Sequence, residues 1–213
     1  MKDLTGKSLI INVCEERGLA EGIDAAKGVI LAGGVVAFPT ESFYGLAVNP
    51  MDEQAVEGLF RVKKRESDLP ILILISSLES LNTYVKEIPD IARALMDKFW
   101  PGGLTILFEP KAYISQRLTA GTGKLGVRLS SHPVATALAG SVNSPITGTS
   151  ANISGRPPCR TAMEVYNYFQ KGILILDGGN TEGGRGSTIV DVTVRPPKIV
   201  RDGMIGAEEL GLL

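Results

Sequence analysis

GVVAFPTESFYGL, residues 34–46, is the stretch that predicts the fold of this chain most directly. The apolar run Val35 to Phe38 ends at Pro39, and the polar residues Thr40 to Ser42 follow. A continuous apolar run of this kind predicts a strand buried on both faces. A helical pattern then carries the cations of 61–65, and a second apolar run occupies 71–75. This order predicts a βαβ-like unit with an anion-binding site beyond the end of its first strand.

The rest of the chain alternates between apolar runs and helical patterns. Strands are predicted at 8–13, 104–108, 125–129, 146–149, 173–176, 188–192 and 198–201. Helices are predicted at 19–31, 52–62, 77–84, 89–99, 132–139, 161–169 and 206–213, whereas 110–124 gives no clear prediction. The neighbouring strands near the C-terminus favour antiparallel pairs. We therefore expect an α/β fold, a single domain over residues 1–213 with one twisted, open, mixed sheet flanked by helices.

Charge and cysteine content argue against several classes of protein. A formal net charge of −1 argues against a generally basic nucleic-acid binder, so such a role would need a local patch. Cys14 and Cys159 form no CxxC motif, which indicates neither a zinc site nor a disulfide. The apolar runs are too short to span a bilayer, and the N-terminus has no apolar signal-peptide core. We expect a cytoplasmic protein with no membrane partner.

Polar and cationic residues recur at the ends of predicted strands and helices. They form four groups, the loop of Thr40, the pair Lys63 and Arg65, the turn of Ser150 and Asn152, and the pair Ser187 and Arg201. Arg128 adds a cation inside an apolar strand, where an unpaired charge is costly. Phosphoryl and adenylyl chemistry needs such a set, because cations neutralise a polyphosphate while hydroxyl and amide groups fix the sugar and the substrate.

Each group also has a purely structural interpretation. Lys63 to Arg65 could be a solvated helix end, where cations suit the helix dipole. Ser150, Asn152 and Ser187 could simply be turn or capping residues. Arg128 could pair with a buried acid. The occurrence of all these groups together, and in this order, favours the functional interpretation.

Seven sequence blocks carry a resemblance to a known family. They are GVVAFPTESFYGL (34–46), KKR followed by DLPILILI (63–75), WPGGLT (100–105), GVR (126–128), TGTSANISG (147–155), GSTIVD (186–191) and VRDG (200–203). With these blocks the chain resembles the threonylcarbamoyl-AMP synthases of the YrdC/Sua5/TsaC family over most of 25–203. The KxR signature of that family falls on Lys63 and Arg65, and its SxN signature falls on Ser150 and Asn152.

The resemblance implies a YrdC-like α/β sheet with a concave, positively charged cavity. It also implies a nucleotidyltransferase that joins L-threonine, bicarbonate or CO₂, and ATP into threonylcarbamoyl-AMP and releases pyrophosphate. This is the first step in making N6-threonylcarbamoyladenosine next to the anticodon of tRNA. The implied cofactor is Mg²⁺, held mainly by the ATP phosphates rather than by protein ligands. The implied partners include downstream threonylcarbamoyl-transferase proteins, and direct contact with tRNA is left open.

The resemblance also assigns roles to single residues. The residues expected to bind ATP are Lys63, Arg65, Ser150, Asn152 and Arg201. The two cations of the KxR signature are also the expected catalytic residues. The residues expected to bind threonine are Thr40, Arg128 and Ser187. Arg128 suits the threonine carboxylate, because a guanidinium grips a carboxylate through two parallel hydrogen bonds.

The sequence departs from the family pattern at a few positions. Ser42 stands where threonine is more usual, Glu66 where proline is frequent, and Leu74 where some members carry a histidine close to the threonine substrate. The chain resembles the short form of the family, which has no extra C-terminal domain.

Two alternative functions remain. One is the carbamoyl-adenylate-forming domain of hydrogenase-maturation proteins, but the chain has no zinc-finger cysteine spacing. The other is a non-catalytic RNA-binding module, which near-zero net charge and the lack of interleaved aromatic residues weaken.

Overall fold

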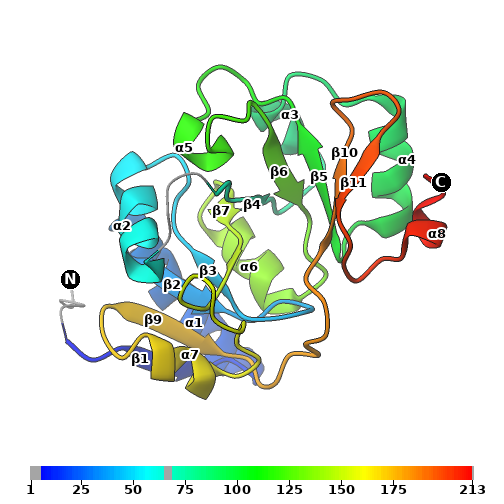
Figure 1. Cartoon of the computed structure of the whole chain (residues 1–213). Helices are drawn as coiled ribbons and strands as arrows, with labels where there is room; N and C mark the ends of the chain where they lie inside the picture. Colours follow the sequence, from blue (N-terminus) through cyan, green and yellow to red (C-terminus); the bar gives the residue numbers. More distant parts are fainter. Residues whose placement is uncertain (1–5, 65–68, 213) are drawn as a thin grey trace.

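The computed structural model describes residues 6–64 and 69–212, whose strands form two mixed sheets (Figure 1). The first sheet has the order β1 (Leu9–Asn12), β9 (Ile173–Asp177), β2 (Val35–Phe38), β3 (Gly45–Ala47) and β8 (Thr149–Ser150). The second has the order β11 (Lys198–Arg201), β10 (Thr188–Asp191), β5 (Leu104–Phe108), β6 (Leu125–Arg128), β4 (Ile73–Leu74) and β7 (Ile146–Thr147). The predicted α/β class with mixed strand directions is confirmed. The strands, however, form two sheets and not the single sheet that was predicted.

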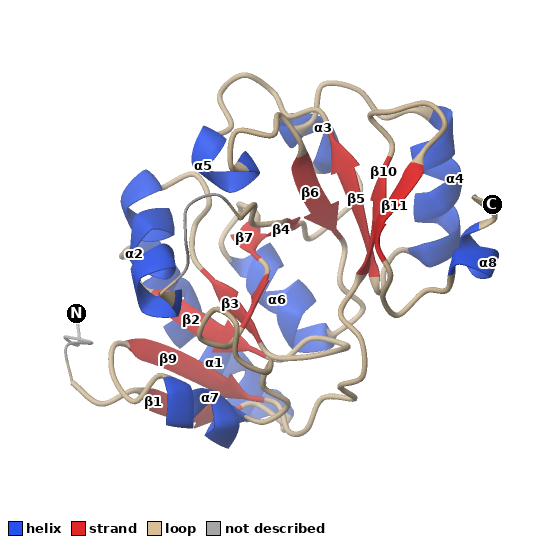
Figure 2. Cartoon of the chain, in the orientation of Figure 1, coloured by secondary structure: helices blue, strands red, loops and turns tan. Residues whose placement is uncertain are grey.

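Helices flank both sheets (Figure 2). They are α1 (Glu16–Leu31), α2 (Glu53–Lys63), α3 (Leu81–Tyr84), α4 (Asp90–Phe99), α5 (Gln116–Thr119), α6 (Pro133–Ser141), α7 (Ala162–Tyr168) and α8 (Ala207–Leu210). The start of α2 is as predicted, because the Asp52 side chain accepts hydrogen bonds from the backbone N–H groups of Gln54 and Ala55. The short helix α5 lies within 110–124, where the sequence pattern gave no prediction. No helix in the described ranges is long and apolar enough to cross a membrane.

Strand β2 is buried on both faces, as its apolar sequence predicts. Val36 and Phe38 face a cluster that includes Ile30 of α1 and Leu138 of α6. The alternate residues of the same strand, at 35 and 37, face the larger core that includes α2. The first sheet is thus covered by helices on both sides.

The predicted βαβ unit is wrong in its connections. After β2 the chain turns back as β3, and Phe38 pairs with Gly45 in an antiparallel hairpin whose loop is 39–44. Helix α2 then leads to β4, which lies in the second sheet. Strand β3 was missed because it has three residues, all buried, and so shows no alternation of apolar and polar positions. The polar loop is therefore the tip of a hairpin between the two sheets.

The strand predicted at 146–149 is divided between the sheets. Ile146 and Thr147 form β7, which pairs with β4 in the second sheet, whereas Thr149 and Ser150 form β8, which pairs with β3 in the first. Gly148 lies at the crossing, where an added Cβ would approach Leu72 Cδ1 to 2.6 Å. A glycine at this position lets the chain pass closely from one sheet to the other and leads it to Ser150.

Candidate functional site

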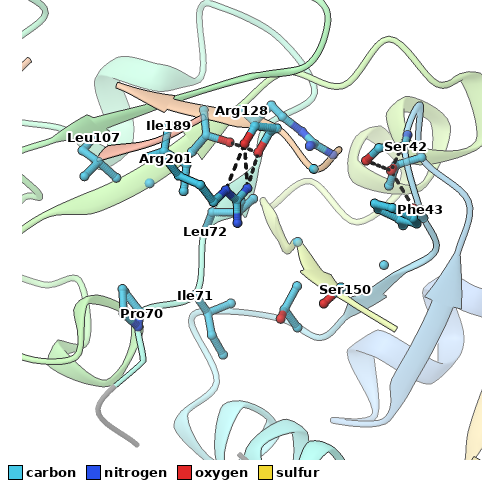
Figure 3. Close-up of a pocket in the computed structure, with 18 of the residues that line it drawn as sticks. Ser42, Phe43, Pro70, Ile71, Leu72, Leu107, Arg128, Ser150, Ile189 and Arg201 are labelled. Carbon is cyan, nitrogen blue, oxygen red and sulfur yellow. Dashed lines mark hydrogen bonds between the residues drawn. The ribbon is translucent and has the colours of Figure 1, made fainter. Parts of the chain in front are cut away.

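A cavity of about 210 Å³ lies between the two sheets (Figure 3). The hairpin loop, the segment 70–72, the strands β5, β6, β10 and β11, and the crossing at 148–150 all contribute residues to it. Residues predicted from sequence that line this cavity are Thr40, Arg128, Ser150, Ser187 and Arg201. The fold therefore brings together five positions that are widely separated along the chain.

The hydroxyl of Thr40 holds the hairpin loop in shape. Thr40 Oγ1 donates to the Phe43 carbonyl at 2.7 Å and accepts from the Ser42 backbone N–H at 3.3 Å. Ser42 Oγ lies 3.5 Å from Thr40 Oγ1, and Figure 3 shows Ser42 and Phe43 together on this wall of the cavity. Because the hydrogen of the Thr40 hydroxyl is used within the turn, this oxygen can meet a ligand only as an acceptor.

Arg128 is a buried cation with unused hydrogen-bonding capacity. Arg128 is 5% exposed, and its Nη1 lies 3.4 Å from Oε1 of Glu41, whose side chain is 11% exposed. Arg128 Nε and Glu41 Oε1 have no hydrogen-bond partner among the described residues. Burial lowers the pKa of Arg128, while the charge of Glu41 opposes that shift. A buried donor without a partner is unfavourable, so this guanidinium is suited to an incoming carboxylate.

Glu41 is a residue of this site that sequence analysis did not identify. Its Oε2 accepts a hydrogen bond from Ser130 Oγ at 2.5 Å, and Glu41 itself is not among the residues that line the cavity. The position of Arg128 in an apolar strand indicated that a buried acid was a possible partner. Nothing local to Glu41 showed that it was this acid, because Glu41 lies in the hairpin loop of the first sheet and Arg128 in β6 of the second.

Arg201 and Ser187 meet at the opposite side of the cavity from the hairpin loop. Arg201 donates from Nε and Nη2 to the Ser187 carbonyl at 3.1 and 2.7 Å, and from Nη2 to Ser187 Oγ at 3.1 Å. Figure 3 shows these bonds, with Arg128 next to them. Burial lowers the pKa of Arg201, and so does the nearby positive charge of Arg128. The guanidinium groups of Arg128 and Arg201 therefore lie close enough for the charge of one to affect the pKa of the other.

Lys63 and Asn152 lie behind Ser150 and do not line the cavity. Lys63 is 1% exposed, and its Nζ donates to the Ser150 carbonyl and, at 2.9 Å, to the Asn152 carbonyl. The Ser150 hydroxyl in turn donates to Oδ1 of Asn152. In this arrangement the lysine fixes the SxN turn from inside. Its predicted contact with phosphates stays a prediction, and Arg65 lies outside the described residues.

The donor set of the cavity fits an anionic ligand. Its lining contains the two arginines and several hydroxyl groups, and no Asp or Glu occurs among the described residues that line it. In the described part of the chain no group of three or more His, Cys, Asp or Glu side chains is placed to hold a metal ion. The arginines and hydroxyl groups of the lining are compatible with Mg²⁺ that enters the cavity bound to the phosphates of a nucleotide. The positive charge of the cavity as a whole stays a prediction.

Comparison with known proteins links the chain to one family. The sequence profile of the Sua5/YciO/YrdC family, described as telomere recombination, matches residues 28–203. The threonylcarbamoyl-AMP synthase of Pyrococcus abyssi is 40% identical over 204 residues, which cover 95% of this chain and 60% of that protein. The threonylcarbamoyl-AMP synthase of Klebsiella pneumoniae is 31% identical over 189 residues, which cover 88% of this chain and 94% of that protein.

A solved structure gives the same result. The crystal structure of Pyrococcus abyssi Sua5 complexed with L-threonine superimposes with a TM-score of 0.89 at 40% identity, covering 95% of this chain and 60% of that one. The chain thus spans about three fifths of the length of the Pyrococcus abyssi protein that it matches.

Proposed function

Because the chain belongs to the Sua5/YciO/YrdC family, we propose that it is an L-threonylcarbamoyladenylate synthase. Its substrates would be L-threonine, bicarbonate or CO₂, and ATP with Mg²⁺, and its products threonylcarbamoyl-AMP and pyrophosphate. This reaction would begin the synthesis of N6-threonylcarbamoyladenosine in tRNA. The proposal is supported by relatives of that name and by a relative crystallised with L-threonine.

One observation in the cavity carries the proposal. Arg128 is buried, and its Nε has no partner among the described residues. A threonine carboxylate would supply two acceptors to this guanidinium and would remove the cost of the unpaired donor. Thr40, on the facing loop, can act only as an acceptor, which suits the amine of the same amino acid. A pure RNA-binding module has no use for such an amino-acid clamp.

The chemistry follows in two steps. The threonine amine attacks the carbon of bicarbonate and forms a carbamate, with loss of water. A carbamate oxygen then attacks the α-phosphorus of ATP, and pyrophosphate leaves. The protein supplies no covalent nucleophile in this scheme; Arg128 and Arg201 hold the anionic reactants in line and offset their charge. Mg²⁺ bound to the ATP phosphates would offset the charge that develops on the leaving pyrophosphate.

The product also defines the partners that we propose. Threonylcarbamoyl-AMP is a mixed anhydride of a carbamate and a phosphate, so a transferase must accept its threonylcarbamoyl group and pass it to tRNA. We place these steps in the cytoplasm, in keeping with the two cysteines, which are both free thiols. Direct contact of this chain with tRNA is not required by the scheme.

The test is pyrophosphate release by the purified chain with each substrate omitted in turn. We expect release with L-threonine, bicarbonate and ATP–Mg²⁺ together, and a fall to background when threonine or bicarbonate is left out. Release that continues without threonine would mean that the chain is not this synthase. L-Valine, which replaces the threonine hydroxyl with a methyl group, is a matched control for the amino acid and should support little release.

A further inference from the structure

One row of residues crosses the second sheet beneath the cavity. Ile189 of β10 pairs with Arg201 of β11 on one side and with Thr105 of β5 on the other. Strand β5 pairs in turn with β6, with Val127 opposite Ile106, and the same antiparallel register places Arg128 opposite Thr105. Cross-strand neighbours in a row share one face of the sheet. All four residues of the row line the cavity, so Thr105 lies on that face between the two arginines.

Thr105 makes a direct hydrogen bond to Ser187. The two hydroxyl oxygens lie 2.8 Å apart, and the residues are 1% and 2% exposed. Ser187 Oγ also accepts a hydrogen bond from Arg201 Nη2. Each hydroxyl has one hydrogen and two lone pairs, so the pair holds two hydrogens and uses one of them in its own bond. The other hydrogen remains for a ligand.

The charges of the site decide which hydroxyl offers that hydrogen. If Thr105 donates, both lone pairs of Ser187 Oγ are occupied, one by Arg201 and one by Thr105, and its hydrogen is left for the cavity. An anionic ligand attracted by the two arginines needs a donor at this point and would be repelled by an exposed lone pair. Hydrogen bonds in such a chain also strengthen one another.

We propose that Thr105 is a positioning residue that donates to Ser187 and thereby turns the Ser187 hydroxyl into a donor aimed at an oxygen of the bound amino acid. This inference rests on the proposed function in taking Ser187 to contact threonine. Thr105 itself need not touch the substrate. The sequence gave no sign of this role, because Thr105 is part of an apolar strand and lies 82 positions from Ser187.

The test is a double-mutant cycle with Thr105→Val and Ser187→Ala. Thr105→Val removes the hydroxyl and keeps the shape, and we expect it to lower kcat/KM for threonine about tenfold while KM for ATP changes less than about twofold. In the Ser187→Ala background the same change should have an effect of less than about twofold, because the group through which Thr105 acts is gone. Thr105→Ser, which keeps the donor, should restore activity. Thr83→Val, at an exposed threonine of α3, is the matched control and should behave as the wild type.

Two outcomes would overturn the proposal. One is an equal loss from Thr105→Val with and without Ser187, and the other is a failure of Thr105→Ser to restore activity. The affinity of the same variants for threonine is also measured by calorimetry, which gives a second double-mutant cycle. A wild-type chain that binds threonine but releases no pyrophosphate would refute the proposed function, and the binding cycle would still decide the role of Thr105. A wild-type chain that binds no threonine would overturn both.

Discussion

Replacement of Arg128 by methionine is expected to lower kcat/KM for threonine by roughly thirtyfold to several thousandfold, because the charge pair that we propose between the buried guanidinium and the threonine carboxylate would be lost. The guanidinium is buried in the cavity wall, and water cannot readily take its place. Methionine keeps an unbranched apolar side chain but has no charge and no N–H donor, so the carboxylate of the substrate would be left without a partner at this position. The measurement is pyrophosphate release as a function of threonine concentration.

A control must separate this effect from loss of the fold. Arg128→Met alone leaves the Glu41 carboxylate, whose side chain is only 11% exposed, without its cation, which should destabilise the chain by up to about 3–5 kcal/mol. The double variant Arg128→Met/Glu41→Gln removes both charges, and we expect it to unfold at a higher temperature than the single variant. It should nevertheless remain inactive. A well-folded double variant with near wild-type dependence on threonine would show that Arg128 does not bind the carboxylate.

Replacement of Lys63 by methionine is expected to damage both stability and the use of ATP. The buried ammonium donates to the carbonyls of Ser150 and Asn152. Its loss removes a charged donor from both carbonyls, and the Ser150 carbonyl then keeps its hydrogen bond from the Asn152 backbone N–H at 2.9 Å. The cost should be about 2–4 kcal/mol, which corresponds to a fall of roughly 5–15 °C in unfolding temperature. Because the SxN turn then loses its support, kcat/KM for ATP should fall roughly a hundredfold.

The adjacent lysine provides the matched control for Lys63. Lys64 caps the same helix but is exposed, so Lys64→Met should leave the unfolding temperature and the ATP dependence close to wild type. Thermal unfolding by circular dichroism and pyrophosphate release at varied ATP concentration are measured on both variants. Similar losses in the two variants would indicate that surface charge, and not support of the turn, explains the role of Lys63.

Local sequence predicted most elements of the fold but not the way in which they join. The buried strand Val35–Phe38 follows from a continuous apolar run, the strand Leu104–Phe108 from a mainly apolar one, and Asp52 is the predicted cap of α2. The division into two sheets occurs at Gly148, where an added Cβ would come close to side-chain atoms of Leu72 and Leu74, and no periodic pattern reveals this crossing. Strand β4 is limited to two residues because only Ile73 and Leu74 pair with neighbouring strands.

The sequence predicted which residues belong to the candidate site better than it predicted what each of them contacts. Cations and small polar residues at strand ends indicated five residues that the fold does gather around one cavity. Lys63 was predicted from its place at a helix end, where a solvated cation is also common, and burial beneath the SxN turn could not be read from that position. The bonds of Glu41 to Ser130 and of Thr105 to Ser187 join distant parts of the chain, so only the folded structure identifies them.

The identity of the product tests the central claim most directly. The chain is incubated with L-threonine, isotopically labelled bicarbonate and ATP–Mg²⁺. The nucleotides are then separated without delay, and their masses are determined by mass spectrometry. The account predicts an AMP adduct whose mass includes one threonine and one labelled carbonyl carbon, formed in step with pyrophosphate. Release of pyrophosphate with AMP alone, or with an adduct that carries no label, would contradict it.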